Sequence, residues 1–149
     1  MKILVDADAC PVKEIIKRIA TKNNLSVIAV CDNAHEINIP GWEVITVDKQ
    51  ADSADFKIIS LLNKNDIVIT GDYGLAGMAL AKRAYVLGFG GKEYTPDNID
   101  ILLMQRHINK KTMKAGGRVK GPKKRTPEDD AYFEKAFELI INRALNILE

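Results

Sequence analysis

Short apolar runs alternate with amphipathic segments along the first two thirds of the chain. Apolar, often β-branched residues fill five runs that we predict to be buried strands, at residues 3–5, 25–30, 43–47, 66–70 and 84–87. Apolar residues at helical spacing lie between them and predict three helices, at residues 11–22, from a cap at Asp52 or Ser53 to residue 62, and at residues 74–82. Strands that alternate with helices in this way form βαβ units. The pattern therefore predicts an α/β fold, a single three-layer domain in which helices flank a mainly parallel sheet.

The last third of the chain has a different character. Thr95 and Pro96 predict the start of a helix that continues to about residue 113. Residues 109–125 contain eight Lys and Arg residues and no acid, and glycine and proline interrupt the segment. This composition predicts a basic loop at about residues 109–125.

A long amphipathic helix is predicted to close the chain at about residues 127–148. Thr126, Pro127 and Asp129 form a typical capped helix start, and a broad apolar face follows. This face packs either on the domain itself or against a partner chain. A homodimer is therefore left open as an alternative.

Composition places few limits on function. The chain has 149 residues, of which 46% are hydrophobic and 28% charged, as expected for one globular domain spanning residues 1–149. Its two cysteines have no zinc-binding spacing. The sequence has no signal-peptide pattern and no apolar run of membrane-spanning length. We therefore expect a cytoplasmic protein that does not associate with membranes.

Aspartates follow the predicted strands at the points where ligands bind in α/β sheets. Asp6 and Asp8 come directly after the first strand, Asp55 lies in the first turn of a helix, and Asp72 follows the fourth strand. These carboxylates are expected to meet at the carboxyl edge of a parallel sheet and to repel one another unless a cation lies between them. A hard divalent cation, Mg²⁺ or Mn²⁺, suits such oxygen ligands. In the simpler alternative, Asp8 only caps a helix and Asp6 is solvated.

The predicted chemistry of this cluster is phosphodiester cleavage. Two ions roughly 4 Å apart can stabilise the attacking and leaving oxygens of such a reaction. We therefore predict that Asp6, Asp8, Asp55 and Asp72 are both metal ligands and catalytic residues. Thr70 and Asp52 are expected to support them from behind, Thr70 by orienting a carboxylate or a metal-bound water.

The basic segment is the predicted nucleic-acid contact. Cations there can bind phosphates without sequence preference and offset the repulsion between an acidic pocket and a polyanion. The residues predicted to do so are Lys120, Lys123, Lys124 and Arg125. A solvated charge run with no ligand is the alternative.

Four segments together resemble the bacterial YaiI/YqxD family. They are VDADACPVK at residues 5–13, ADSAD at 51–55, TGDYGLA at 70–76 and GPKKRT at 121–126. That resemblance implies a fold similar to PIN-domain nucleases. It also implies that Asp6 is the acid of the first strand.

The resemblance to PIN domains carries over at two further places and fails at one. Asp55 corresponds to the acid of the middle helix, where PIN domains often have Glu. Thr70 and Asp72 correspond to a threonine-x-aspartate motif after a later strand. PIN domains commonly have another acid just beyond this aspartate, whereas residues 73–74 are Tyr and Gly here. Asp8 is the candidate to supply the missing carboxylate.

Three functional hypotheses follow from these residues. The first is a metal-dependent nuclease that acts on RNA in preference to DNA. The second is a non-catalytic module that binds metal and RNA. The third is a haloacid-dehalogenase-type phosphatase, because Asp6 and Asp8 mimic its nucleophile and acid. The third is the least favoured, since no acid follows Asp72 at the short distance that this fold requires.

Overall fold

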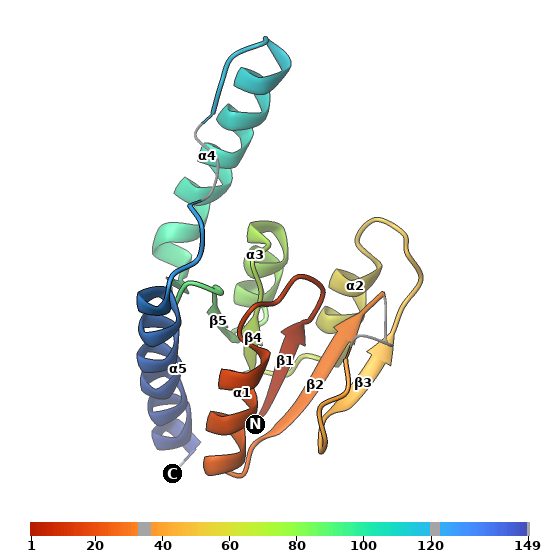
Figure 1. The fold of residues 1–149 in the computed structure, drawn as a ribbon, viewed down its shortest axis with the longest axis vertical. Helices are drawn as coiled ribbons and strands as arrows, with labels where there is room; N and C mark the ends of the chain where they lie inside the picture. The colour runs from red at the N-terminus through yellow and green to blue at the C-terminus, as the bar shows by residue number, and fades with distance from the viewer. Residues whose placement is uncertain (33–36, 120–122, 149) are drawn as a thin grey trace.

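The computed structural model describes residues 1–32, 37–119 and 123–148. One six-stranded sheet, in the order β3-β2-β1-β4-β5-β6, forms its centre (Figure 1). β1 to β5 are parallel, and β6 pairs antiparallel with β5. The strands are β1 (Lys2–Asp6), β2 (Ser26–Cys31), β3 (Glu43–Thr46), β4 (Ile67–Ile69), β5 (Tyr85–Leu87) and β6 (Glu93–Tyr94).

Helices cover both faces of this sheet. They are α1 (Lys13–Lys22), α2 (Ser53–Leu61), α3 (Tyr73–Ala81), α4 (Pro96–Lys114) and α5 (Pro127–Leu148). Side chains of α1 and α5 pack with Ile3 and Val5 on one face, and those of α2, α3 and the start of α4 pack with Leu4 on the other. The predicted three-layer α/β fold is confirmed.

The central strand places the first aspartate. β1 lies between β2 and β4, and Ile3, Leu4 and Val5 are fully buried. A strand covered on both faces is apolar at every position, which explains the unbroken apolar run before Asp6. Asp6 ends β1 opposite Val30 of β2, at the carboxyl edge of the sheet.

The predicted helix to about residue 113 is confirmed, and the predicted basic loop, which overlapped it from residue 109, is wrong in its first part. α4 continues through Lys114, so residues 109–114 are helical, and the upper part of α4 extends well beyond the sheet (Figure 1). No Gly or Pro occurs in this helix after Pro96, so the basic residues continue it. The helix ends where Gly116 adopts a positive φ of 81° and Gly117 N–H donates to the Thr112 carbonyl at 2.9 Å.

The buried face of helix α2 differs from the apolar face that its sequence predicts. Phe56 is apolar, yet it is 65% exposed, whereas Asp55 is only 8% exposed. Asp52 occupies the N-cap position with a left-handed φ of 66°, but its side chain makes no capping hydrogen bond. An acid therefore faces the interior in the first turn of α2.

In the ranges that the structure describes, none of the helices combines the length and the apolar surface that crossing a bilayer requires.

Candidate functional site

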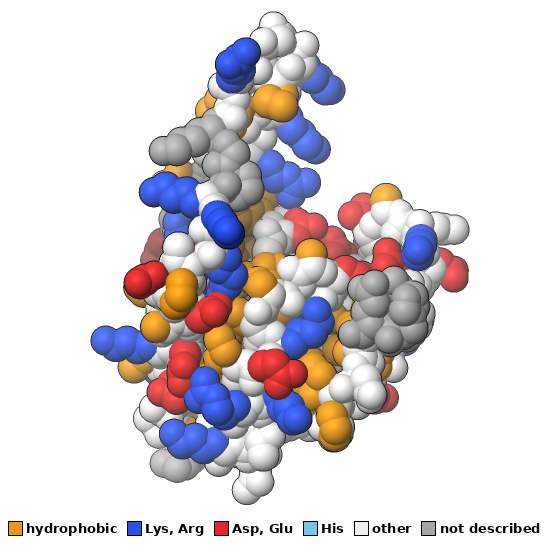
Figure 2. Space-filling view, in the orientation of Figure 1, with side chains coloured by type: hydrophobic (Ala, Val, Ile, Leu, Met, Phe, Trp, Pro, Cys, Tyr) orange, Lys and Arg blue, Asp and Glu red, His pale blue; other side chains and the backbone are white. Residues whose placement is uncertain are grey.

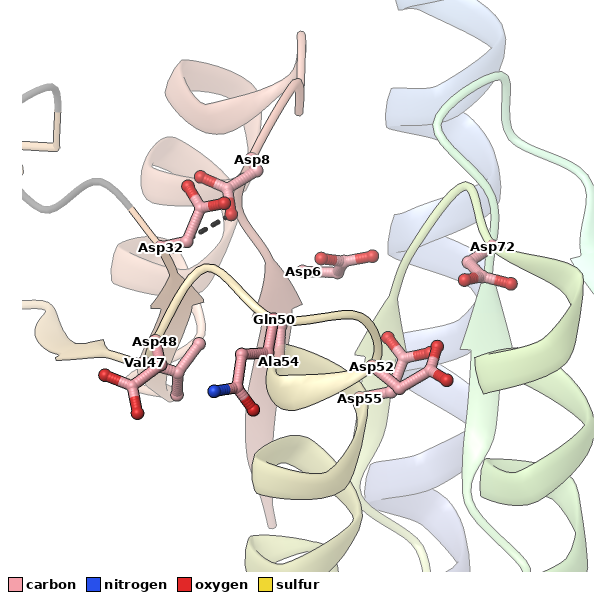
Figure 3. Close-up of a pocket in the computed structure, with 10 residues that line it drawn as sticks. All are labelled: Asp6, Asp8, Asp32, Val47, Asp48, Gln50, Asp52, Ala54, Asp55 and Asp72. Carbon is pink, nitrogen blue, oxygen red and sulfur yellow. Dashed lines mark hydrogen bonds between the residues drawn. The ribbon is translucent and has the colours of Figure 1, made fainter.

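A pocket rich in aspartate lies at the carboxyl edge of the sheet. Its volume is about 200 Å³, and seven aspartates line it (Figure 3). The lining residues are Asp6, Asp8, Asp32, Val47, Asp48, Gln50, Asp52, Ala54, Asp55 and Asp72. All five predicted aspartates are therefore present, together with Asp32 and Asp48, which follow β2 and β3.

Asp6 is held in place from behind by Thr70. The fully buried hydroxyl of Thr70 donates to Asp6 Oδ2 at 2.7 Å, and Thr70 Oγ1 accepts from Asp72 N–H at 3.0 Å. Burial raises the pKa of Asp6; the Thr70 hydrogen bond opposes that shift, and the charges of Asp72 and Asp8 add to it. Thr70 thus joins the ends of β1 and β4, and the carboxylate that it orients is Asp6.

Asp72 lies at the start of α3. Its Oδ1 accepts from Gly74 N–H at 2.7 Å, which caps the helix. Arg106 Nη1 of α4 lies 3.4 Å from the same oxygen. One carboxylate oxygen therefore faces both a helix N-terminus and a cation from a distant helix.

Asp55 has the most strongly perturbed carboxyl group of the pocket. Burial is the largest of the effects that raise its pKa from 3.8 to about 6. The charges of Asp72, Asp6 and Asp52 and a hydrogen bond with the Asp72 carboxyl group contribute to the same shift. Figure 3 shows Asp52 and Asp55 together at the start of α2. The negative charges at this point are thus close enough to oppose one another's ionisation.

Asp8 is directed toward β2 instead. Its Oδ2 accepts from Asp32 N–H at 2.8 Å, and Figure 3 shows the two side chains side by side above Asp6. Asp8 lines the same pocket, but its carboxylate is engaged with the end of β2. That Asp8 replaces the acid missing after Asp72 stays a prediction.

The donor chemistry of the pocket fits a hard divalent cation, because carboxylate oxygens are the ligands that Mg²⁺ and Mn²⁺ prefer. The distances between the carboxylates do not fit a single bound ion. Among residues 1–32, 37–119 and 123–148, no group of three Asp, Glu, His or Cys side chains is placed to hold one ion. The predicted four-carboxylate metal site is therefore not confirmed as a ready-made site.

A wider groove adjoins the pocket and contains residues that the sequence did not indicate. It has a volume of about 790 Å³ and is lined by Asp6, Asp8, Ala9, Gly71, Asp72, Tyr73, Phe89 and Arg106. Arg106 and Phe89 come from segments that are distant in sequence from the aspartates, so no local sequence pattern predicts their place in this groove. Asp32 and Asp48 could have been found, because each follows a predicted parallel strand.

The predicted nucleic-acid residues have different positions. Lys120 lies outside the described residues. Lys123 and Lys124 are exposed just before α5. Arg125 has protein partners: its Nε donates to Asp130 Oδ1 at 2.7 Å and its Nη2 donates to the Phe89 carbonyl at 2.9 Å. Arg125 was predicted to contact phosphate, and these bonds show that it also has a structural role.

Replacing Arg125 with glutamine is expected to lower the free energy of unfolding by about 1 kcal/mol, because both half-buried hydrogen bonds are lost. Lys124→Gln removes the same charge from an exposed neighbour and should change stability little. Urea unfolding of the two variants measures the difference. Equal stability of both variants would show that the Arg125 bonds contribute nothing.

The comparisons with known proteins agree on one family. The family described as "Uncharacterized BCR, YaiI/YqxD family" matches residues 4–143. A UPF0178 protein of Clostridium acetobutylicum is 47% identical over 145 residues, covering 96% of this chain and 98% of its own. Another from Ruminiclostridium cellulolyticum is 50% identical over 141 residues, covering 95% and 92%. No solved structure gives a significant match. The chain therefore belongs to the YaiI/YqxD family, as the four sequence segments indicated.

Proposed function

We propose that this chain is a nuclease that depends on Mg²⁺ or Mn²⁺ and hydrolyses phosphodiester bonds, in RNA rather than DNA. One observation supports this most: Asp6, Asp55 and Asp72, from three separate elements, face one pocket in which burial and mutual repulsion raise the pKa of two of them. Perturbed carboxyl groups that share a cleft are typical of functional sites.

The three carboxylates would hold the cation. Their mutual repulsion costs free energy that a bound divalent ion would relieve. Asp8 lines the same pocket, and one of its oxygens accepts from Asp32 N–H. The carboxylates would have to approach the ion, since no three of the described acidic side chains already have that spacing. Once bound, such an ion supplies electrostatic stabilisation of the negative charge that develops on a reacting phosphate.

The protein's own residues supply orientation. The Thr70 hydroxyl fixes one oxygen of Asp6 and leaves the other free to face the pocket. The backbone N–H of Gly74 fixes Asp72. Such bonds keep carboxylates in position and are typical of sites in which ligand direction matters.

Cleavage by the wild-type protein is the direct test. Labelled unstructured RNA, structured RNA and DNA of equal length are incubated with Mg²⁺, Mn²⁺ or a chelator. We expect cleavage of RNA that needs a divalent ion and stops in the chelator. Absence of cleavage with every substrate and ion would overturn the nuclease proposal.

The spacing of the carboxylates favours a second candidate, a non-catalytic nucleic-acid-binding module. No three of the described acidic side chains are placed to hold one ion, and nucleic-acid binding without cleavage does not require such a site. RNA binding that is unchanged by divalent ions, together with no cleavage, would select this candidate.

A further inference from the structure

The upper part of α4 forms an arm beside the acidic pocket. We define the arm as residues 104–114, the part that follows Ile99 and Leu103, which pack with side chains of α3. Figure 1 shows it extending beyond the sheet, and Figure 2 shows Lys and Arg side chains along its flank above the red acidic surface. A basic surface therefore stands next to an acidic one.

Helical periodicity puts three of these cations on one face. Arg106, Lys110 and Lys114 are four residues apart, so they line one side of α4 about 6 Å apart along its axis. Ile99 and Leu103, which pack toward α3, precede them on the same side. All three cationic residues are exposed. The face of α4 that packs on the domain at the start of the helix therefore carries a row of cations further along, and we call Arg106, Lys110 and Lys114 the basic ladder.

Arg106 joins this ladder to the acidic pocket. Its Nη1 lies 3.4 Å from Asp72 Oδ1, and the two side chains are 45% and 39% exposed. A pair this long and this exposed contributes little to stability, so either partner can exchange it for another. The guanidinium also lines the 790 Å³ groove, where it is available to a phosphate.

Two aromatic rings line the same groove. The ring of Phe89 rests on Gly71, where a Cβ would lie 3.0 Å from Phe89 Cε2, and Tyr73 packs edge-on against Tyr94 at 5.5 Å. Both rings are half-buried and held by neighbours. Fixed rings beside a cation suit an unpaired base and its phosphate, because stacking needs a free base face.

We propose that the Arg106, Lys110 and Lys114 face of α4 binds the phosphate backbone of a single-stranded nucleic acid, and that Arg106 exchanges Asp72 for a phosphate when the strand enters the groove. The ladder holds the strand at the arm, and Phe89 and Tyr73 receive a base. This assignment names the substrate class for the function proposed above. It moves the main phosphate contact from residues 120–125 to α4.

Fluorescence anisotropy with a labelled unstructured RNA, in chelator, tests this surface without any cleavage. Arg106→Gln is expected to weaken binding about tenfold. The triple variant with Lys110→Gln and Lys114→Gln should also reduce the slope of log affinity against log salt by about 2. Lys135→Gln, an exposed charge on α5, is the matched control. If Arg106→Gln behaves like Lys135→Gln, the surface is assigned wrongly.

The exchange is tested by a double-mutant cycle. Asp72→Asn should strengthen RNA binding, and the gain should be smaller when Arg106 is already glutamine, because no guanidinium is then released. Equal gains in both backgrounds would overturn the exchange. Duplex RNA that binds as tightly as the single strand would overturn the single-strand assignment. A protein that passes these tests but does not cleave RNA would retain this surface and lose the proposed nuclease activity.

Discussion

Asp6→Asn is expected to reduce cation-dependent RNA cleavage at least about 100-fold while the protein stays folded. The amide keeps the size of the side chain and can still accept from the Thr70 hydroxyl, so the local geometry is preserved. It removes the negative charge at the centre of the pocket, between the ends of β2 and β4. Losses of this size are usual when electrostatic stabilisation of developing charge is removed, and here it would come from the cation that Asp6 would hold. Single-turnover cleavage in Mn²⁺ measures the effect.

Asp48→Asn is the matched control for this prediction. Asp48 lines the same pocket, but it is exposed and lies after β3, apart from Asp6, Asp55 and Asp72 (Figure 3). A change in overall pocket charge would affect both variants alike, whereas a specific role of Asp6 affects only the first. Unchanged cleavage in the Asp6→Asn protein would trace the activity to a contaminating nuclease or to another site.

The sequence predicted those features that arise from local patterns. An unbroken apolar run ending in Asp6 predicted a central strand, and the position of Asp72 after β4 predicted its place at the same edge. Thr70 was expected to orient a carboxylate, and the structure identifies that carboxylate as Asp6. β6 was missed because two residues at a sheet edge form no pattern that differs from a loop.

Other features depend on tertiary contacts that no local pattern contains. Asp8 lines the pocket as expected, but the sequence did not indicate that the backbone N–H of Asp32, twenty-four residues away, donates to its carboxylate. Arg106 reaches Asp72 only because α4 packs on α3. The inverted exposure of Asp55 and Phe56 has the same origin, because the rotation of α2 is set by how Ile58 packs on the sheet.

Asp55→Asn is expected to stabilise the protein near pH 7.5 by about 1–3 kcal/mol. The pKa of this carboxyl group is 3.8 ordinarily and about 6 in the folded protein, so the folded state binds the proton more tightly. The contribution of this group to the free energy of unfolding is therefore greatest below pH 3.8, falls as pH rises between the two values and stays low above about 6. Each pKa unit corresponds to about 1.4 kcal/mol, and partial solvent screening reduces the total. Urea unfolding from pH 4 to 7.5 should show this decline in the wild type and a flatter profile in the variant.

The Asp55→Asn variant also tests whether the carboxylates of the pocket bind a cation or only repel one another. If Asp55 helps to hold a divalent ion, millimolar Mn²⁺ should raise the melting temperature of the wild type at pH 7.5 and do so much less in Asp55→Asn, because ligand binding to the folded state stabilises it. Asp100→Asn, an exposed aspartate on α4, should respond like the wild type. An equal rise in all three proteins would place the ion outside this pocket. In that case the carboxylates repel one another without a bound ion, and the binding-module function would replace the nuclease.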